Sequence, residues 1–184
     1  MNIFGFTEKE VLMKHYMAAG MILLMTVAGI SACKEEKYVH VGPKWDALHK
    51  LTPPEDTFQV RVSGNVKAKL GENLSFRITS GKDGKLWIVQ VDPQDELTLL
   101  FPNENVSDNT ISARKSLSVP PRGAEWSIEA SEPAGRSVVA FVITTGPIDI
   151  RDVLSEKKDI SKALRLVNES GEWGIGKLVI DIGD

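Results

Sequence analysis

Side chains that commonly carry out chemistry are scarce in this sequence of 184 residues. It contains one cysteine, Cys33, and three histidines, of which His40 and His49 are separated by eight residues. A zinc site built on these residues would lack ligands, because structural zinc needs four. A serine triad would have to recruit one of the same histidines, and the Gly-x-Ser-x-Gly motif is absent. No pair of carboxylates stands out either. We therefore predict no catalytic residues, no metal and no cofactor.

One motif comes close to a nucleotide-binding loop. Residues 171–178 (GEWGIGKL) match a phosphate-binding loop, except that Leu178 replaces the Ser or Thr that holds Mg²⁺. Such a loop also requires a helix whose N-terminus faces the phosphate. The residues after Lys177 alternate instead as a strand. We predict a glycine-rich turn before a final strand, and no nucleotide binding.

An acidic cluster at another turn is a candidate for binding a cation. Asp92, Asp95 and Glu96 lie close together between two apolar runs. A dedicated calcium loop needs six to eight oxygen ligands, more than this cluster offers. We predict a solvated turn.

Large aromatic and amide side chains supply the remaining candidates for binding. Three tryptophans lie within or beside predicted strands, where packing in the core is the default for so large a side chain. Exposed tryptophans would instead mark an interaction site. The polar loop 103–109 (NENVSDN) is the longest polar break and carries three asparagines. The candidate interaction surface comprises Trp87, Trp126, Trp173, Asn103, Asn105 and Asn109.

Cys33 has a specific setting at the end of an apolar segment. No charged side chain occurs from Tyr16 to Cys33, a basic Lys14 precedes the segment, and all five methionines fall in the first 25 positions. The segment suits a secretory signal better than a spanning helix, although a transmembrane anchor with a buried cysteine is the alternative. Residues 30–33 (ISAC) resemble the bacterial lipobox.

The lipobox resemblance implies that Cys33 receives a diacylglyceryl group and that the signal is cleaved between Ala32 and Cys33. The signal peptide would be 1–32, with translation starting at Met13 if the acidic residues upstream are not translated. Several acyl chains give lasting attachment to a bilayer. Because Lys34 rather than Asp follows the cysteine, the resemblance favours an outer membrane lipoprotein that faces the periplasm.

We predict that the rest of the chain is a tether followed by one domain. Residues 33–54 are mixed and charged, with Trp45 and Leu48 able to dock, whereas apolar alternation recurs over 55–184. We predict a mainly β fold, an antiparallel β-sandwich of about eight strands with one C-terminal amphipathic helix. That helix would place Ile160, Ala163, Leu164 and Val167 on one face, after an N-cap at Asp159. The predicted strands are 58–62, 74–78, 86–91, 97–101, 111–119, 126–130, 137–144 and 177–182, and 148–154 could add a helical turn.

Residues 86–147 resemble the bacterial domain of unknown function 4384. The resemblance is carried by residues 99–103 (LLFPN) and 132–135 (EPAG), together with the apolar strand that follows the second motif. Each motif also has a structural explanation, since proline and asparagine end strands and form turns. The family assigns no catalytic residues, so the resemblance implies none here.

These observations lead to an expectation for function. With 42% hydrophobic residues and a net charge of -3, the chain is neither disordered nor a polybasic nucleic-acid binder. We expect a non-enzymatic lipoprotein, held to the membrane by the lipid on Cys33, that binds a protein partner in an envelope or secretion assembly. The alternative is an envelope enzyme or carbohydrate-binding module that acts on peptidoglycan or polysaccharide.

Overall fold

A computed structural model describes residues 42–169 and 171–183 of the chain. The predicted signal peptide and the lipidation site at Cys33 lie outside the described residues. Among the helices that the structure does describe, none has the length and apolar character needed to cross a membrane.

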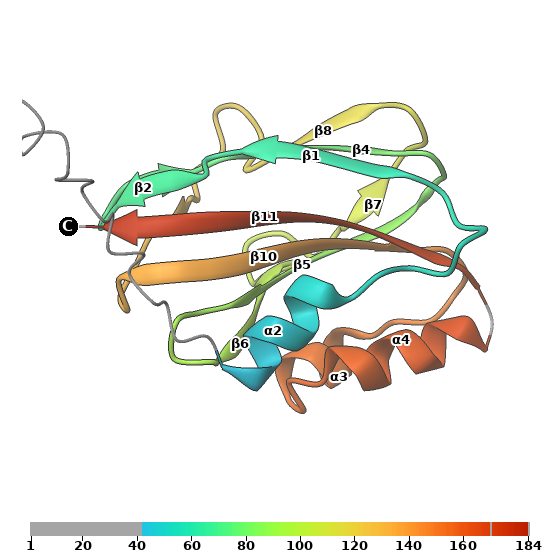
Figure 1. Ribbon diagram of the computed structural model, residues 1–184. Coiled ribbons are helices and arrows are strands. Elements are labelled where there is room, and N and C mark those ends of the chain that lie inside the picture. The colour runs from blue at the N-terminus through green and yellow to red at the C-terminus, as the bar shows by residue number, and fades with distance from the viewer. Residues whose placement is uncertain (1–41, 170, 184) are drawn as a thin grey trace, which may run out of the picture. The chain divides into compact units, whose positions relative to one another are not determined.

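A six-stranded sheet forms the middle layer of the domain (Figure 1). Its strands follow the order β2-β11-β10-β5-β6, and β7 pairs with β5 beyond the end of β6. All neighbours are antiparallel except β2 and β11, which run parallel. The strands are β2 (Lys67–Lys69), β5 (Gly84–Val91), β6 (Leu97–Phe101), β7 (Thr110–Ile111), β10 (Gly135–Thr144) and β11 (Trp173–Gly183).

The middle layer is covered on both faces, which explains the near-continuous apolar sequences of its central strands. In β10, Val138, Ala140 and Val142 pack into one core, while Val139 and Phe141 pack into the other. Because side chains alternate across a strand, a sheet with two covered faces needs apolar residues at successive positions. All five of these side chains are fully buried.

Three helices cover one face of this sheet (Figure 1). The predicted C-terminal helix is confirmed: the Asp159 side chain caps it by accepting a 2.9 Å hydrogen bond from the backbone N–H of Lys162. Ile160, Ala163, Leu164 and Val167 are buried, as their spacing predicts. The helices are α2 (Pro43–Lys50), α3 (Arg151–Ser155) and α4 (Ile160–Asn168).

A smaller sheet covers the opposite face. It has three antiparallel strands in the order β1-β4-β8, and a separate two-stranded ladder, β3 with β9, lies in the same core. The central strand β4 alternates buried with exposed or partly exposed positions, because one face of the small sheet is open to solvent. The strands are β1 (Val60–Gly64), β3 (Asn73–Leu74), β4 (Phe76–Ser80), β8 (Ser116–Val119) and β9 (Ile128–Glu129).

The mainly β, sandwich-like class is confirmed, and the strand list needs correction. The structure describes eleven strands, several of two or three residues, where eight were predicted. The predicted strand 111–119 is two strands in different sheets, because the chain turns between Ser112 and Lys115. The predicted strand 126–130 is shorter in the structure, where it corresponds to β9. Short α3 lies in the segment where a helical turn was considered, and α2 lies in the segment assigned to the tether, with Trp45 and Leu48 buried.

The predicted glycine-rich turn at 171–176 is also corrected, since β11 already begins at Trp173. Gly174 and Gly176 are strand residues that face β1. A Cβ atom on Gly174 would lie 2.9 Å from both the ring and the carbonyl oxygen of Phe58, and one on Gly176 would lie 2.8 Å from Val62. Glycine occurs here because the two sheets approach closely at this point.

Candidate functional site

The open face of the three-stranded sheet carries polar side chains in register across its strands. Arg61 of β1 lies opposite Thr79 of β4, and Ser63 lies opposite Arg77. On the other side of β4, Thr79 lies opposite Ser116 and Arg77 opposite Ser118. Alternation places these side chains on the same face, and the inward positions between them bury residues such as Ile78. Arg61 and Arg77 therefore lie in diagonal positions on adjacent strands, for which the Cα atoms are roughly 7–8 Å apart.

Two turns extend this surface with further arginines. Arg122 follows β8, and Arg114 lies in the turn that precedes it, where the Lys115 N–H bonds the Ser112 carbonyl. Arg114 has φ of 61°, in the left-handed region that side-chain-bearing residues rarely adopt. Its N–H donates a 2.7 Å hydrogen bond to the Ser80 carbonyl, which fixes the turn to the end of β4. We call the surface of Arg61, Arg77, Arg114, Arg122 and the hydroxyls between them the arginine face.

Three hollows lie on the arginine face, and two pairs of arginines line them. Arg61 and Arg114 line a hollow of about 340 Å³ with Gln59 and Thr79. Arg77 and Arg122 line a hollow of about 360 Å³ with the serines at 63, 75 and 118, and they also line the adjoining hollow over Ser116. Aspartate and glutamate are absent from the described residues that line these three hollows.

Acidic side chains of the described residues lie outside these three hollows, although Glu55 lines a neighbouring hollow together with Arg61. All four arginines are exposed, and none forms an ion pair within the part of the chain that the structure describes. A 3.3 Å hydrogen bond from Arg61 to Gln59 is the side-chain contact seen among them. The chain as a whole has a net charge of -3, and four of its 22 lysines and arginines lie on this face. Such a face attracts anions.

Two of the tryptophans named as interaction candidates are buried. Trp87 is fully buried in β5, and its indole N–H donates a 2.9 Å hydrogen bond to the Thr144 hydroxyl. Trp173 is 4% exposed and donates to the Asn168 side chain. Both belong to the core between the sheet and the helices. Trp126 is half-buried and stacks on Phe101 at a centroid distance of 6.4 Å.

The loop asparagines have different environments. Asn103 accepts hydrogen bonds from the N–H groups of Asn105 and Val106, at 3.0 and 3.1 Å, which makes it a turn former. Asn109 is buried, and its amide donates to the Leu86 carbonyl at 3.0 Å. Asn105 is exposed. None of the three lines the hollows of the arginine face.

The acidic turn is exposed or partly exposed, and its carboxylates also make structural contacts. Asp92 accepts hydrogen bonds from the N–H groups of Gln94 and Glu96, both at 2.9 Å. Asp95 accepts from the first turn of α2. Glu96 pairs with Lys44 and Lys158, and the hydrogen bond from Lys158 lowers its pKa. No group of three or more metal-binding side chains occurs within the described ranges.

Lys177, the lysine of the phosphate-loop-like motif, contacts the end of α2. Its ammonium group donates to the carbonyls of His49 and of Leu51, the latter at 2.8 Å. A cation here satisfies carbonyl groups left free at a helix C-terminus. Burial lowers the pKa of Lys177 below its ordinary value. The lysine is therefore engaged by helix carbonyls in this structure.

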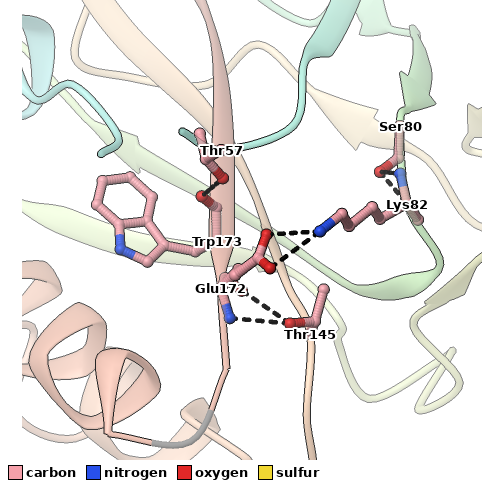
Figure 2. A network of polar contacts seen from close by, with 6 residues as sticks. All are labelled: Thr57, Ser80, Lys82, Thr145, Glu172 and Trp173. Atoms are coloured by element: carbon pink, nitrogen blue, oxygen red, sulfur yellow. Dashed lines mark hydrogen bonds and ion pairs between the residues drawn. The ribbon is translucent and has the colours of Figure 1, made fainter. Parts of the chain in front are cut away.

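The start of the same motif belongs to a polar network shown in Figure 2. Lys82, in the turn between β4 and β5, donates to both carboxylate oxygens of Glu172 at 2.8 and 2.9 Å. Thr145 exchanges hydrogen bonds with the Glu172 backbone, and Thr57 donates to the Trp173 carbonyl at 2.6 Å. These contacts join the start of β11 to β10 and to the chain entering β1. Their role is structural.

Sequence reasoning missed the arginine face. Arg61 and Arg77 occupy polar positions in the predicted strands 58–62 and 74–78, and this alternation is the signal that could have marked them. The sequence does not show that these strands pair with each other, or that both flanking turns bring arginines to the same side.

Comparison with known families agrees with the resemblance found in the central segment. Residues 67–147 match the family model described as Domain of unknown function (DUF4384). The match runs from β2 through β10 and includes Arg77, Arg114 and Arg122, whereas Arg61 precedes it. Neither the curated proteins nor the solved structures contain a match.

Proposed function

We propose that this chain is an outer membrane lipoprotein, anchored through Cys33 and facing the periplasm, that serves as a non-enzymatic binding component of an envelope or secretion assembly. A protein of that assembly is the proposed partner, and the arginine face is the proposed contact surface. The observation that carries the proposal is the set of four exposed arginines, without an acidic partner among the described residues, on a sheet face that no other element of the described fold covers.

The anchor is tested by metabolic labelling with palmitate. We expect the chain to incorporate label and to fractionate with the outer membrane, and Cys33→Ala to lose the label. Cys33→Ser is the matched control for side-chain size and should lose it as well. Labelling that persists in both variants would disprove lipidation at Cys33.

The contact surface is tested by crosslinking in intact cells followed by mass spectrometry. We expect the native chain to capture a reproducible partner, and the double variant Arg61→Gln/Arg77→Gln to capture it at least tenfold less. The control Lys157→Gln/Arg165→Gln removes two exposed charges near and on the helices. Equal capture by both double variants would show that the arginine face is not the contact surface.

The alternative, an envelope enzyme or carbohydrate-binding module, receives less support. Carbohydrate recognition would call for exposed aromatic platforms, and Trp87 and Trp173 are buried. Glycosidase chemistry would call for two facing carboxylates, and none lines the three hollows of the arginine face.

A further inference from the structure

The size and polarity of the arginine face limit what it can bind. Three strands of four or five residues present an area of roughly 250 Å², from ordinary strand spacing and rise. A standard protein interface buries ~800 Å² on each partner. Val66 is the large hydrophobic side chain that is exposed among the described residues, and it lines none of these hollows. The hollows of the face therefore suit a compact, strongly anionic group.

Charge matching distinguishes between the two common anionic groups. Each hollow is lined by two arginines, and a guanidinium group stays protonated in proteins. A phosphate monoester carries about -1.5 to -2 charges at neutral pH, whereas a carboxylate carries one. A pair of arginines is therefore neutralised by one phosphate monoester but only half neutralised by one carboxylate.

The number of donors leads to the same choice. Guanidinium groups offer planar pairs of N–H donors that fit phosphate oxygens. Hydroxyl groups stand beside them, at Thr79 in one hollow and at Ser63, Ser75 and Ser118 in the other. A phosphate group presents three oxygens in different directions, which allows it to use donors from both arginines and from a hydroxyl.

Arg114 adds an independent observation. Its turn position, with φ of 61°, is one that glycine or asparagine would adopt at lower cost. Side-chain-bearing residues rarely adopt this region, and the Arg114 side chain lines one of the hollows.

We infer that the arginine face binds phosphate monoesters, with one group at each pair of arginines. The inference goes beyond the proposed function, which gives this face a protein partner: it assigns the hollows of the face to a phosphorylated ligand, and the protein contact is tested separately by crosslinking. A phosphorylated lipid headgroup and a soluble phosphorylated sugar share this chemistry.

The test is isothermal titration calorimetry of the full mature chain in nonionic detergent micelles. Glucose 1,6-bisphosphate is the probe, and glucarate, a sugar acid with two carboxylates, is the matched control. We expect the bisphosphate to bind at least tenfold more tightly at pH 7.5. Its affinity should fall at pH 5.5, because the second pKa of a phosphate monoester is about 6, while that of glucarate should not change. Equal affinities for the two compounds would overturn the inference.

Variants assign the binding to the hollows. We expect Arg61→Gln/Arg114→Gln and Arg77→Gln/Arg122→Gln each to weaken bisphosphate binding at least tenfold, and Lys157→Gln/Arg165→Gln to stay within twofold. Arg114→Gly adds a variant whose fold should be retained, because glycine adopts positive φ readily, and it should weaken binding as well. Binding that survives in all of these variants would place the phosphate elsewhere and refute the inference.

Mixed micelles that contain phosphatidic acid distinguish the two sources of phosphate. Arginine-dependent affinity for these micelles, above that for the sugar, would assign the face to a lipid headgroup, and the reverse order to a soluble ligand. Failure of both probes would overturn the inference. A preference for a polyglutamate peptide would overturn it too, yet would leave the proposed function intact with an acidic protein as partner. Loss of partner capture is measured separately, so the two failures are distinguishable.

Discussion

The carboxylate of Asp95, in the turn between β5 and β6, caps α2 by accepting a 2.7 Å hydrogen bond from the backbone N–H of Trp45. A second bond comes from the N–H of Lys44 at 3.1 Å. The residue at the N-cap position itself is Gly42, which provides no side-chain cap. A Cβ atom on Gly42 would lie 2.2 Å from Asp95. Because Gly42 has no side chain, the Asp95 carboxylate can approach and cap the helix, 50 residues beyond Trp45 in the sequence.

Asp95→Ala should lower the free energy of unfolding by about 1–2 kcal/mol, because loss of an N-cap costs about that much. Urea denaturation measures the change, and hydrogen exchange should show faster exchange at Trp45 and Lys44. Asp95→Asn is the control: asparagine retains a capping oxygen and tolerates the φ of 65° at this position. If the two variants were equally destabilised, the capping role would be wrong.

Gly174→Ala should destabilise the fold by roughly 1–3 kcal/mol, the usual cost of overpacking a core. The added methyl group would lie 2.9 Å from the Phe58 carbonyl oxygen, which cannot turn away as a side-chain end could. Gly183→Ala, in the same strand with no atom within 4 Å of the added Cβ, is the control. Thermal denaturation of both variants measures the difference. A Gly174 variant as stable as the Gly183 variant would contradict the close approach of β1 and β11.

Lys177→Met should lower stability at neutral pH by about 1 kcal/mol, because two hydrogen bonds to helix carbonyls are lost. The pKa of Lys177 is lowered in the folded state by burial. The unfolded chain therefore binds more protons between that lowered pKa and the ordinary 10.5, so this lysine adds stability as pH rises through that window. In this pH window, the free energy of unfolding of the native chain should rise relative to that of the variant. A constant difference across that window would contradict the pKa shift.

Thr144→Val should cost about 1–3 kcal/mol, because it leaves the indole N–H of Trp87 buried without a partner. Thr144→Ser retains the hydroxyl and should recover most of that loss apart from the missing methyl group. Guanidinium denaturation followed by tryptophan fluorescence measures both. Equal losses in the two variants would show that packing, rather than the hydrogen bond, determines the effect.

Sequence patterns predicted the elements that are stabilised by residues close to them in the sequence. The α4 helix has its cap at Asp159 and its apolar stripe in adjacent sequence, and the β5–β6 hairpin has its turn residues between two apolar runs. The short strand β2 was not predicted, because its partner β11, distant in the sequence, stabilises it. The glycines at 174 and 176 were misread, since only the approach of β1 explains them.

The same distinction applies to the candidate site. Alternation in β1 and β4 made Arg61 and Arg77 visible as polar positions, yet no local signal indicates that these strands are neighbours. Arg114 was placed inside a predicted strand, because its left-handed conformation depends on the bond to Ser80. The three tryptophans were candidates because of their residue type, and two of them are buried in the core.

The burial of β10 on both faces has a consequence for strand alignment. Its apolar run would fit the two cores almost equally well after a shift along β5, so hydrophobicity alone does not select the register. The polar residues at its ends do select it. Ser137 accepts from Gln90 at 3.2 Å, and Thr144 accepts from Trp87. Any slip would separate both pairs at once, so these two hydrogen bonds specify the alignment of the central strand.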